Sequence, residues 1–178
     1  MFDATLVEEV RSRIRDVPDF PKKGILFKDI TPAFAHGPTF QRLIEAFAER
    51  YRTQKIDAIA GIESRGFLLA APTAARLGKG VVLLRKPGKL PHLTHRESYA
   101  LEYGNDALEI HQDAIRPGMR IVIMDDLLAT GGTMGAAVRL ARRLEAEVVE
   151  ASFVIELEFL AGRKRLEGVP VAALLGYG

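Results

Sequence analysis

Hydrophobic and polar positions follow two kinds of pattern along this chain. Short apolar runs without alternation are typical of strands covered on both faces of a parallel sheet, and apolar stripes at helical spacing lie between many of them. The strands predicted in this way cover residues 56–62, 81–84, 121–124, 148–157 and 171–175. The sequence therefore predicts an α/β fold: a twisted, mostly parallel central sheet flanked by helices and joined by right-handed crossovers.

Helices are predicted before and between these strands. The first begins near Thr5, which has capping-box spacing to Glu8, and ends near Asp16, before Pro18. A second helix follows Gly37, and its aromatic residues lie on the apolar stripe that is expected in the core. Further helices are predicted at 67–78, from 133 to about 144, and at 159–166. Pro72 should bend the first of these or mark a local loss of hydrogen bonding.

Two segments lack a sustained period. Residues 19–35 are interpreted as an ordered loop, and 87–105 as a long excursion with a short strand candidate at 99–103. Long loops in compact domains are usually functional or disordered, so the excursion is predicted to be a flexible lid. Leu108 and Ile110 suggest one more strand, before a turn at Pro117.

Composition narrows the class of protein. The 178 residues, 48% of them hydrophobic and 27% charged, fit one globular domain over 1–178. No apolar run approaches the roughly 18 residues of a membrane span, and the first residues do not resemble a secretory signal. With no cysteine, a cytoplasmic location is expected. The net charge of only +2 gives no indication of nucleic-acid binding.

Candidate chemistry is concentrated between Arg120 and Met134. Asp125 and Asp126 are expected at the carboxyl end of a buried strand, where open α/β sheets bind ligands. A turn without bulky side chains follows, and its backbone amides and the next helix can enclose a phosphate: Ala129, Thr130, Gly131, Gly132 and Thr133. Adjacent carboxylates repel a bare phosphate, so the ligand should also offer hydroxyl groups or a divalent metal, as a ribose phosphate does.

This stretch has other interpretations. The turn could be a plain connection in which Thr133 caps the helix. A Walker A loop is excluded because no lysine follows the glycines, and no G-x-G-x-x-G is present. Basic residues follow two other predicted strands: Arg65 after the first, and Arg85 and Lys86 after the second. Around an anion-binding turn, they are suited to a second anionic group.

The stretch between Arg120 and Met134 resembles the phosphoribosyl pyrophosphate signature of type I phosphoribosyltransferases. It matches that signature in its apolar run, in Asp-Asp, in the two apolar residues that follow and in Ala-Thr-Gly-Gly-Thr. Six further segments are similar to the branch of that family that acts on adenine: FPKKGILFKDITP, GIESRGFL, LLRKPGKLP, SYALEYG, LEIHQDAI and GRKRLEG. This resemblance covers nearly the whole chain. It implies that a homodimer converts adenine and phosphoribosyl pyrophosphate to AMP and pyrophosphate with Mg²⁺, under an N-terminal hood of about 1–35 and a lid of about 87–105.

The resemblance also implies roles for individual residues. The turn from Ala129 to Thr133 would hold the 5′-phosphate, and the two aspartates would hold the ribose hydroxyls directly or through metal-bound water. Mg²⁺ would be held mainly by pyrophosphate, ribose hydroxyls and water, near Asp125. The pyrophosphate would meet one group of residues: Ser64, Arg65, Arg85, Lys86 and Lys89. Adenine would lie against Leu26, Phe27 and Lys28. The catalytic residues would be Glu102, which would assist proton transfer, and Arg65. Arg85 could act across the dimer interface.

Two alternatives to this function remain open from the sequence. One is transfer of the phosphoribosyl group to another nucleobase, against which the segment around Leu26 to Lys28 argues. The other is a regulator that senses nucleotides without catalysis. A regulator of this kind usually needs a DNA-binding module, and the sequence offers no basic helix-turn-helix extension.

Overall fold

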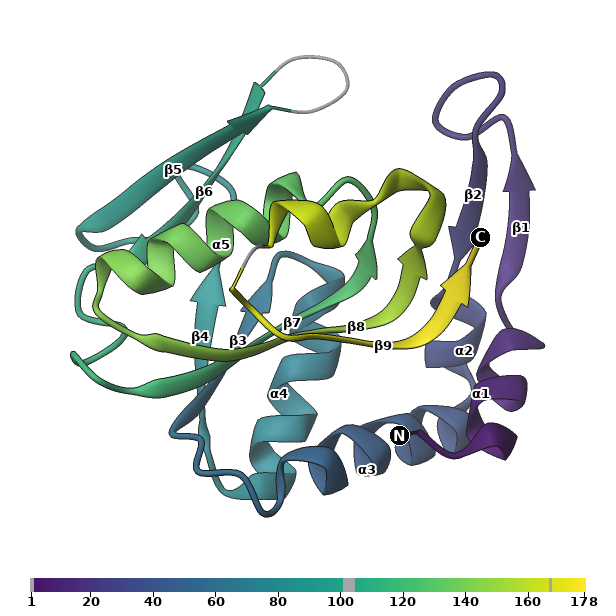
Figure 1. Cartoon of the computed structure of the whole chain (residues 1–178), viewed down its shortest axis with the longest axis horizontal. Coiled ribbons are helices and arrows are strands. Elements are labelled where there is room, and N and C mark those ends of the chain that lie inside the picture. The colour runs from purple at the N-terminus through teal and green to yellow at the C-terminus, as the bar shows by residue number, and fades with distance from the viewer. Residues whose placement is uncertain (1, 101–104, 167) are drawn as a thin grey trace.

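The computed structural model describes residues 2–100, 105–166 and 168–178. Its centre is a five-stranded parallel sheet in the order β4-β3-β7-β8-β9 (Figure 1). The strands are β3 (Ala58–Ile62), β4 (Gly80–Leu84), β7 (Arg120–Leu128), β8 (Glu147–Leu157) and β9 (Val171–Tyr177). The predicted α/β fold with a parallel central sheet is therefore confirmed.

Helices cover both faces of the sheet (Figure 1). On one face, α5 (Gly132–Arg143) packs on alternate residues of β3 and β7, such as Ala60 and Ile123. On the other face, α3 (Gly37–Tyr51) and α4 (Arg65–Leu77) pack against Ile59 and Val122. Because both faces are covered, β3 is buried at every position, which explains its unbroken apolar sequence.

Two antiparallel hairpins rise beside the carboxyl ends of the sheet strands (Figure 1). One pairs β1 (Arg15–Pro18) with β2 (Leu26–Asp29), and the other pairs β5 (Thr94–Ala100) with β6 (Asn105–His111). The remaining elements are α1 (Ala4–Arg11), α2 (Thr31–Ala35) and two short 3₁₀ helices, η1 (Glu158–Leu160) and η2 (Gly162–Arg165).

The N-terminal segment differs from its prediction. The first helix ends at Arg11 rather than near Asp16, and Asp3 caps it by accepting hydrogen bonds from the backbone amides of Thr5 and Leu6, both at 3.3 Å. The predicted loop at 19–35 contains β2 and α2. Because β1 and β2 leave most side chains at least partly exposed, the pair has no apolar alternation that would have revealed it.

Three other predicted elements differ from the structure. The central strand continues through the two aspartates to Leu128 instead of ending at Met124. The strand in the excursion, predicted at 99–103, is β5 and begins at Thr94. The strand predicted from Leu108 and Ile110 is β6, which pairs with β5 outside the main sheet. The helix predicted at 159–166 is two 3₁₀ helices. Pro72 lies within α4, which continues past it as one helix to Leu77.

Candidate active site

The predicted phosphate turn lies between β7 and α5. Gly131 has φ +80°, a conformation that glycine adopts without strain, and α5 begins at Gly132. Thr133 lies in the first turn of α5 and is not its cap, and no side chain caps this helix. The amides at the start of α5 are therefore not used by a side-chain cap, as a phosphate-binding turn requires.

The two aspartates differ in their surroundings. Asp126 is 4% exposed, and its Oδ2 accepts a hydrogen bond from Nε of Arg65 at 2.5 Å. Asp125 accepts one from the backbone amide of Asp126 at 2.9 Å. Desolvation and then the charge of Asp126 raise the pKa of Asp125 well above its ordinary value. The site therefore holds two different carboxyl groups. Asp126 is already paired with an arginine, whereas the charged form of Asp125 would be stabilised by a hydroxyl or cationic ligand.

Arg65 reaches Asp126 because α4 starts very close to β7. A Cβ added at Gly66 would lie 2.6 Å from the backbone oxygen of Met124 and 3.2 Å from Oδ1 of Asp125. Ser64 is at the N-cap position of α4, and the Glu63–Ser64 peptide before it is cis. Glycine at position 66 thus permits the approach that brings the ends of β3 and β7 together.

Glu63 organises the basic residues at the next strand end. Its carboxylate accepts hydrogen bonds from Nε of Arg85 at 3.2 Å, from the backbone amide of Lys86 at 2.9 Å and from Nζ of Lys89 at 2.6 Å. Burial alone would raise the pKa of Glu63, but these three donors lower it below its ordinary value. The Lys86 ammonium instead pairs with Asp106 and donates to the Tyr99 hydroxyl at 2.8 Å.

All four basic residues predicted to meet pyrophosphate are thus paired with carboxylates of the chain. The sequence pattern singled out neither Glu63 nor Asp106 as a partner. For Glu63, the signal was an acid directly between a buried strand and Ser-Arg-Gly. For Asp106, no local signal existed, because its contact with Lys86 depends on how the β5–β6 hairpin folds back.

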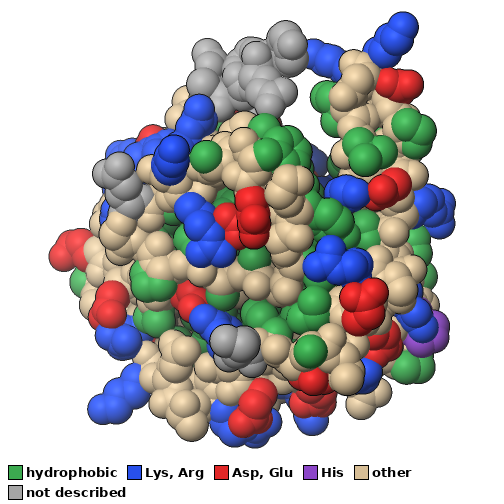
Figure 2. Space-filling model, turned by 45° about the vertical axis from the view of Figure 1, so that its right-hand side comes forward, with side chains coloured by type: hydrophobic (Ala, Val, Ile, Leu, Met, Phe, Trp, Pro, Cys, Tyr) green, Lys and Arg blue, Asp and Glu red, His purple; other side chains and the backbone are tan. Residues whose placement is uncertain are grey.

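The residues predicted to read adenine lie on the other hairpin. Leu26 is 50% exposed, whereas Phe27 and Lys28 are partly buried. The ring of Phe27 meets Phe20 edge to face at 5.2 Å, and Nζ of Lys28 is 2.7 Å from Oδ1 of Asp16. Figure 2 shows this hairpin standing apart from the body, with hydrophobic side chains near its tip and a hollow beside it.

Asp29, the last residue of β2, links this hairpin to the acid pair. Hydrogen bonds from Thr31 are the main cause of its lowered pKa, and the nearby charge of Arg65 contributes. The β1–β2 hairpin therefore ends within electrostatic reach of the arginine that holds Asp126. Glu102, predicted to assist proton transfer, lies outside the described residues.

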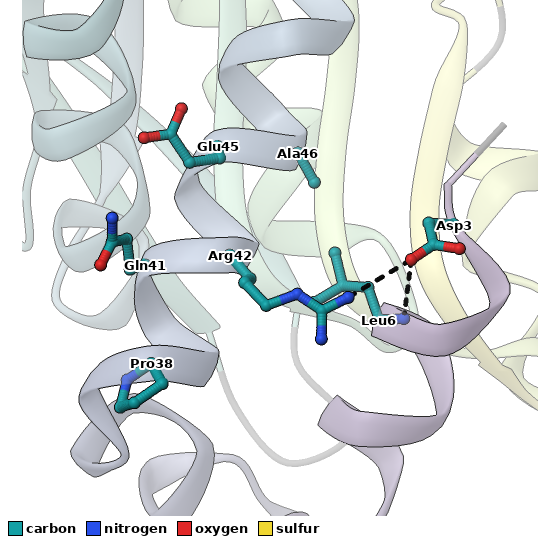
Figure 3. Close-up of a pocket in the computed structure, with 7 residues that line it drawn as sticks. All are labelled: Asp3, Leu6, Pro38, Gln41, Arg42, Glu45 and Ala46. Atoms are coloured by element: carbon teal, nitrogen blue, oxygen red, sulfur yellow. Dashed lines mark hydrogen bonds and ion pairs between the residues drawn. The ribbon is translucent and has the colours of Figure 1, made fainter.

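A separate cavity of about 450 Å³ lies between α1 and α3 (Figure 3). Arg42 reaches across it to Asp3, with Nη2 3.3 Å from Oδ2. The cavity is lined by Asp3, Leu6, Pro38, Gln41, Arg42, Glu45 and Ala46. None of these is a predicted site residue, and the elements that line the cavity lie away from the phosphate turn (Figure 1).

Comparison with known proteins agrees with the fold. The phosphoribosyl transferase domain family matches residues 33–168. The parallel central sheet flanked by helices is the fold of that class, so the chain has a phosphoribosyltransferase fold. Among the described residues, no helix is long and apolar enough to cross a membrane.

More similar relatives narrow the class. The adenine phosphoribosyltransferase of Geobacter metallireducens is 54% identical over 171 residues, covering 96% of this chain and all of the relative. That of Anaeromyxobacter dehalogenans strain 2CP-1 is 55% identical over 172 residues, covering 97% and 100%. This chain therefore belongs to the adenine phosphoribosyltransferase family.

Solved structures give the same result. The adenine phosphoribosyltransferase of Thermoanaerobacter pseudethanolicus has a TM-score of 0.93 at 51% identity, covering 96% of this chain and 99% of that one. The Saccharomyces cerevisiae enzyme, crystallised with adenine and an imino-altritol bisphosphate, has a TM-score of 0.92 at 44% identity, covering 97% and 100%.

Proposed function

We propose that this protein transfers the phosphoribosyl group of phosphoribosyl pyrophosphate to N9 of adenine, giving AMP and pyrophosphate. The observation that carries the proposal is the acid pair beside a glycine turn, with basic residues at the neighbouring strand ends. A relative from Trypanosoma brucei, 26% identical, was crystallised with AMP, pyrophosphate and ribose-5-phosphate, which supports the assignment.

In the proposed complex, the amides from Ala129 to Thr133 bind the 5′-phosphate, and Asp125 and Asp126 bind the ribose hydroxyls. The pyrophosphate binds among Ser64, Arg65, Arg85, Lys86 and Lys89. Because Glu63, Asp106 and Asp126 pair with these cations in the free protein, pyrophosphate must share or replace those partners. Pyrophosphate carries more charge than one carboxylate, which favours the exchange.

Catalysis would follow from this arrangement of charges. As N9 of adenine attacks the anomeric carbon, positive charge develops on the ribose and negative charge on the departing pyrophosphate. The aspartates lie on the ribose side, and the basic residues stabilise the leaving group. Leu26, Phe27 and Lys28 would position the base, and Glu102 would accept its proton.

Mg²⁺ fits this site as a metal held largely by the substrate. The described residues contain no group of three or more histidine, cysteine or acidic side chains that could hold a metal. Asp125 and Asp126 offer carboxylate oxygens, which Mg²⁺ prefers, and substrate phosphates and water supply the remaining ligands in such sites. Bound Mg²⁺ would neutralise charge on the leaving pyrophosphate.

The proposed homodimer has an apolar face on which to form. Val81 and Leu83 of the edge strand β4 are 40% and 42% exposed. They lie on the same face of the sheet as Ile59 of the neighbouring strand, which is covered by helices. Leu68 of α4 is 49% exposed. A second copy covering this edge would also come close to Arg85, directly after β4, as the proposed role of Arg85 across the interface requires.

Sedimentation tests the dimer. Leu83→Asp should shift the protein toward monomer, because it places a charge in a proposed apolar interface. Phe159→Asp, at a side chain that is 65% exposed outside this face, is the matched control and should leave the association unchanged. A wild-type protein that sediments as a monomer at assay concentrations would contradict the proposal.

The activity test uses purified protein with phosphoribosyl pyrophosphate and one base at a time. AMP should form from adenine with Mg²⁺, and removal of Mg²⁺ should abolish most of it. Faster product formation from guanine, hypoxanthine, xanthine or uracil would replace the base assignment. Tight binding of phosphoribosyl pyrophosphate without any product would favour the non-catalytic regulator.

The lid at 87–105 is tested separately. We expect amide hydrogen exchange in this segment to slow when both substrates bind, because closure excludes water from the reacting ribose. Unchanged exchange with and without substrates would remove the lid from the proposal.

A further inference from the structure

We propose that η2 (Gly162–Arg165) is a support that fixes the position of the phosphate turn, and that Glu156, Gly162 and Arg163 are positioning residues for phosphoribosyl pyrophosphate. The inference rests on the proposed function of the turn. Helix α5 and most or all of strand β8 separate these residues from the turn in the sequence, and none of the three is expected to contact either substrate.

The first observation is direct contact between two backbones. Gly162 is buried, and a Cβ added to it would lie 2.2 Å from the backbone oxygen of Ala129 and 3.1 Å from the backbone nitrogen of Gly131. In the other direction, a Cβ on Gly131 would lie 2.4 Å from the oxygen of Gly162. Cβ atoms in proteins essentially never approach within 3.0 Å, so only glycine at both positions allows this contact.

The second observation is an ion pair that holds η2 in place. The Glu156 carboxylate is buried and accepts two parallel hydrogen bonds from Arg163, from Nε and Nη2, both at 2.6 Å. Arg163 Nη1 also donates to the backbone oxygen of Val171 at 2.9 Å. Such a bidentate pair fixes the guanidinium in orientation as well as in distance.

The sheet register places this pair beside the turn. Glu156 on β8 is paired with Leu128 on β7, and Leu128 immediately precedes Ala129. The anchor for η2 is therefore level with the start of the phosphate turn. Glu156, Arg163 and Gly162 form a continuous connection from the rigid sheet to the back of the turn.

The turn needs an external support because its own residues give it little. Gly131 and Gly132 have no side chains that could pack, and the helix start has no side-chain cap. The basic sequence GRKR suggests an anion site, but the charge of Arg163 is already satisfied by Glu156. The role of this arginine is thus to hold the backbone and not to attract phosphate.

The main test is Gly162→Ala in the full chain. Moving the turn by about 1 Å should raise the KM for phosphoribosyl pyrophosphate by at least about tenfold. The KM for adenine, measured at saturating phosphoribosyl pyrophosphate, should stay within about twofold of wild type, because the base lies on another hairpin. Gly37→Ala is the matched control: a Cβ there meets nothing within 4 Å, and both KM values should remain unchanged.

Two further variants test the anchor and remain informative if Gly162→Ala does not fold. Glu156→Gln and Arg163→Ala should each raise the KM for phosphoribosyl pyrophosphate by about threefold to tenfold, and Arg163→Lys, which keeps the charge and one hydrogen bond, should restore part of the loss. A purely structural role would lower the melting temperature of these variants while leaving both KM values as in wild type.

The outcomes separate the inference from the proposed function. If wild type forms AMP and the folded variants keep its KM for phosphoribosyl pyrophosphate, the inference is wrong and the function stands. If wild type forms no AMP, the proposed function is wrong. In that case, calorimetry measures the affinity of wild type and variants for phosphoribosyl pyrophosphate. Weaker binding by the variants is expected, and unchanged affinity would overturn the inference.

Discussion

Gly66→Ala should damage both the fold and the site, because Gly66 lets α4 start against β7. The added Cβ would lie 2.6 Å from the backbone oxygen of Met124 and 3.2 Å from Oδ1 of Asp125. The first atom belongs to the backbone of a buried central strand, which cannot move aside easily. Helix α4 must therefore shift outward, and it takes Arg65 away from Asp126.

Two effects on stability oppose each other in this variant. Alanine in place of glycine favours a helix by up to about 1 kcal/mol. Overpacking against a rigid neighbour costs about 1–3 kcal/mol, so the loss should exceed the gain. For a net loss of about 1.5 kcal/mol, a chain of this size should melt roughly 3–6 °C lower.

Activity should fall by more than stability suggests. A displacement of a few tenths of an ångström to 1 Å at a group that orients the substrate reduces kcat/KM by about 10- to 100-fold. Scanning calorimetry and steady-state AMP formation measure the two effects. Gly37→Ala is the matched control, since it also lies in the first turn of a helix but meets nothing within 4 Å, and it should melt no lower than wild type. Wild-type kinetics and melting in Gly66→Ala would refute the reasoning.

Four other predictions concern the predicted site and one buried ion pair. Asp125→Asn should raise the KM for phosphoribosyl pyrophosphate by about tenfold and leave the KM for adenine nearly unchanged, whereas Leu26→Ala should do the reverse, and the same defect in both would contradict this division. Burial and the charge of Asp126 raise the pKa of Asp125, so this group contributes stability that is fully present below its ordinary pKa of 3.8 and is lost as pH rises. Asp125→Asn should escape that loss, so urea unfolding at pH 7 should find it more stable than wild type, with little difference at pH 3. Glu102→Gln should lower kcat by about 100-fold if Glu102 accepts the proton, and nearly full turnover would remove that role. Glu150→Ala should cost about 3 kcal/mol of unfolding free energy, because Glu150 is 7% exposed and accepts hydrogen bonds from Arg50 at 2.7 Å and Tyr51 at 2.6 Å. Glu49→Ala, which removes an exposed partner of Arg52, should cost under about 1 kcal/mol in the same urea titration.

The sequence by itself was sufficient for the parts of the chain whose environment repeats along the backbone. Strands β3 and β8 and helix α3 were predicted close to their observed bounds. A strand covered on both faces shows a continuous apolar run in the sequence, and a helix with one buried face shows apolar residues at helical spacing. The phosphate turn was also predicted from local chemistry, since glycines, small residues and two acids are contiguous. Assignment of these residues to substrates remains a prediction.

Contacts between distant segments were decided only by the tertiary structure. The β1–β2 hairpin stayed hidden because its partly exposed side chains leave no periodic signal. Glu63, Asp106 and Arg163 are ordinary charged residues in the sequence, and only their positions after folding show which charges they neutralise. The contact of Gly162 with the phosphate turn depends on the order and register of the strands. The physical reason is that burial pattern and turn chemistry act between near neighbours, whereas the geometry of this site is set where separate strand ends and loops meet in space.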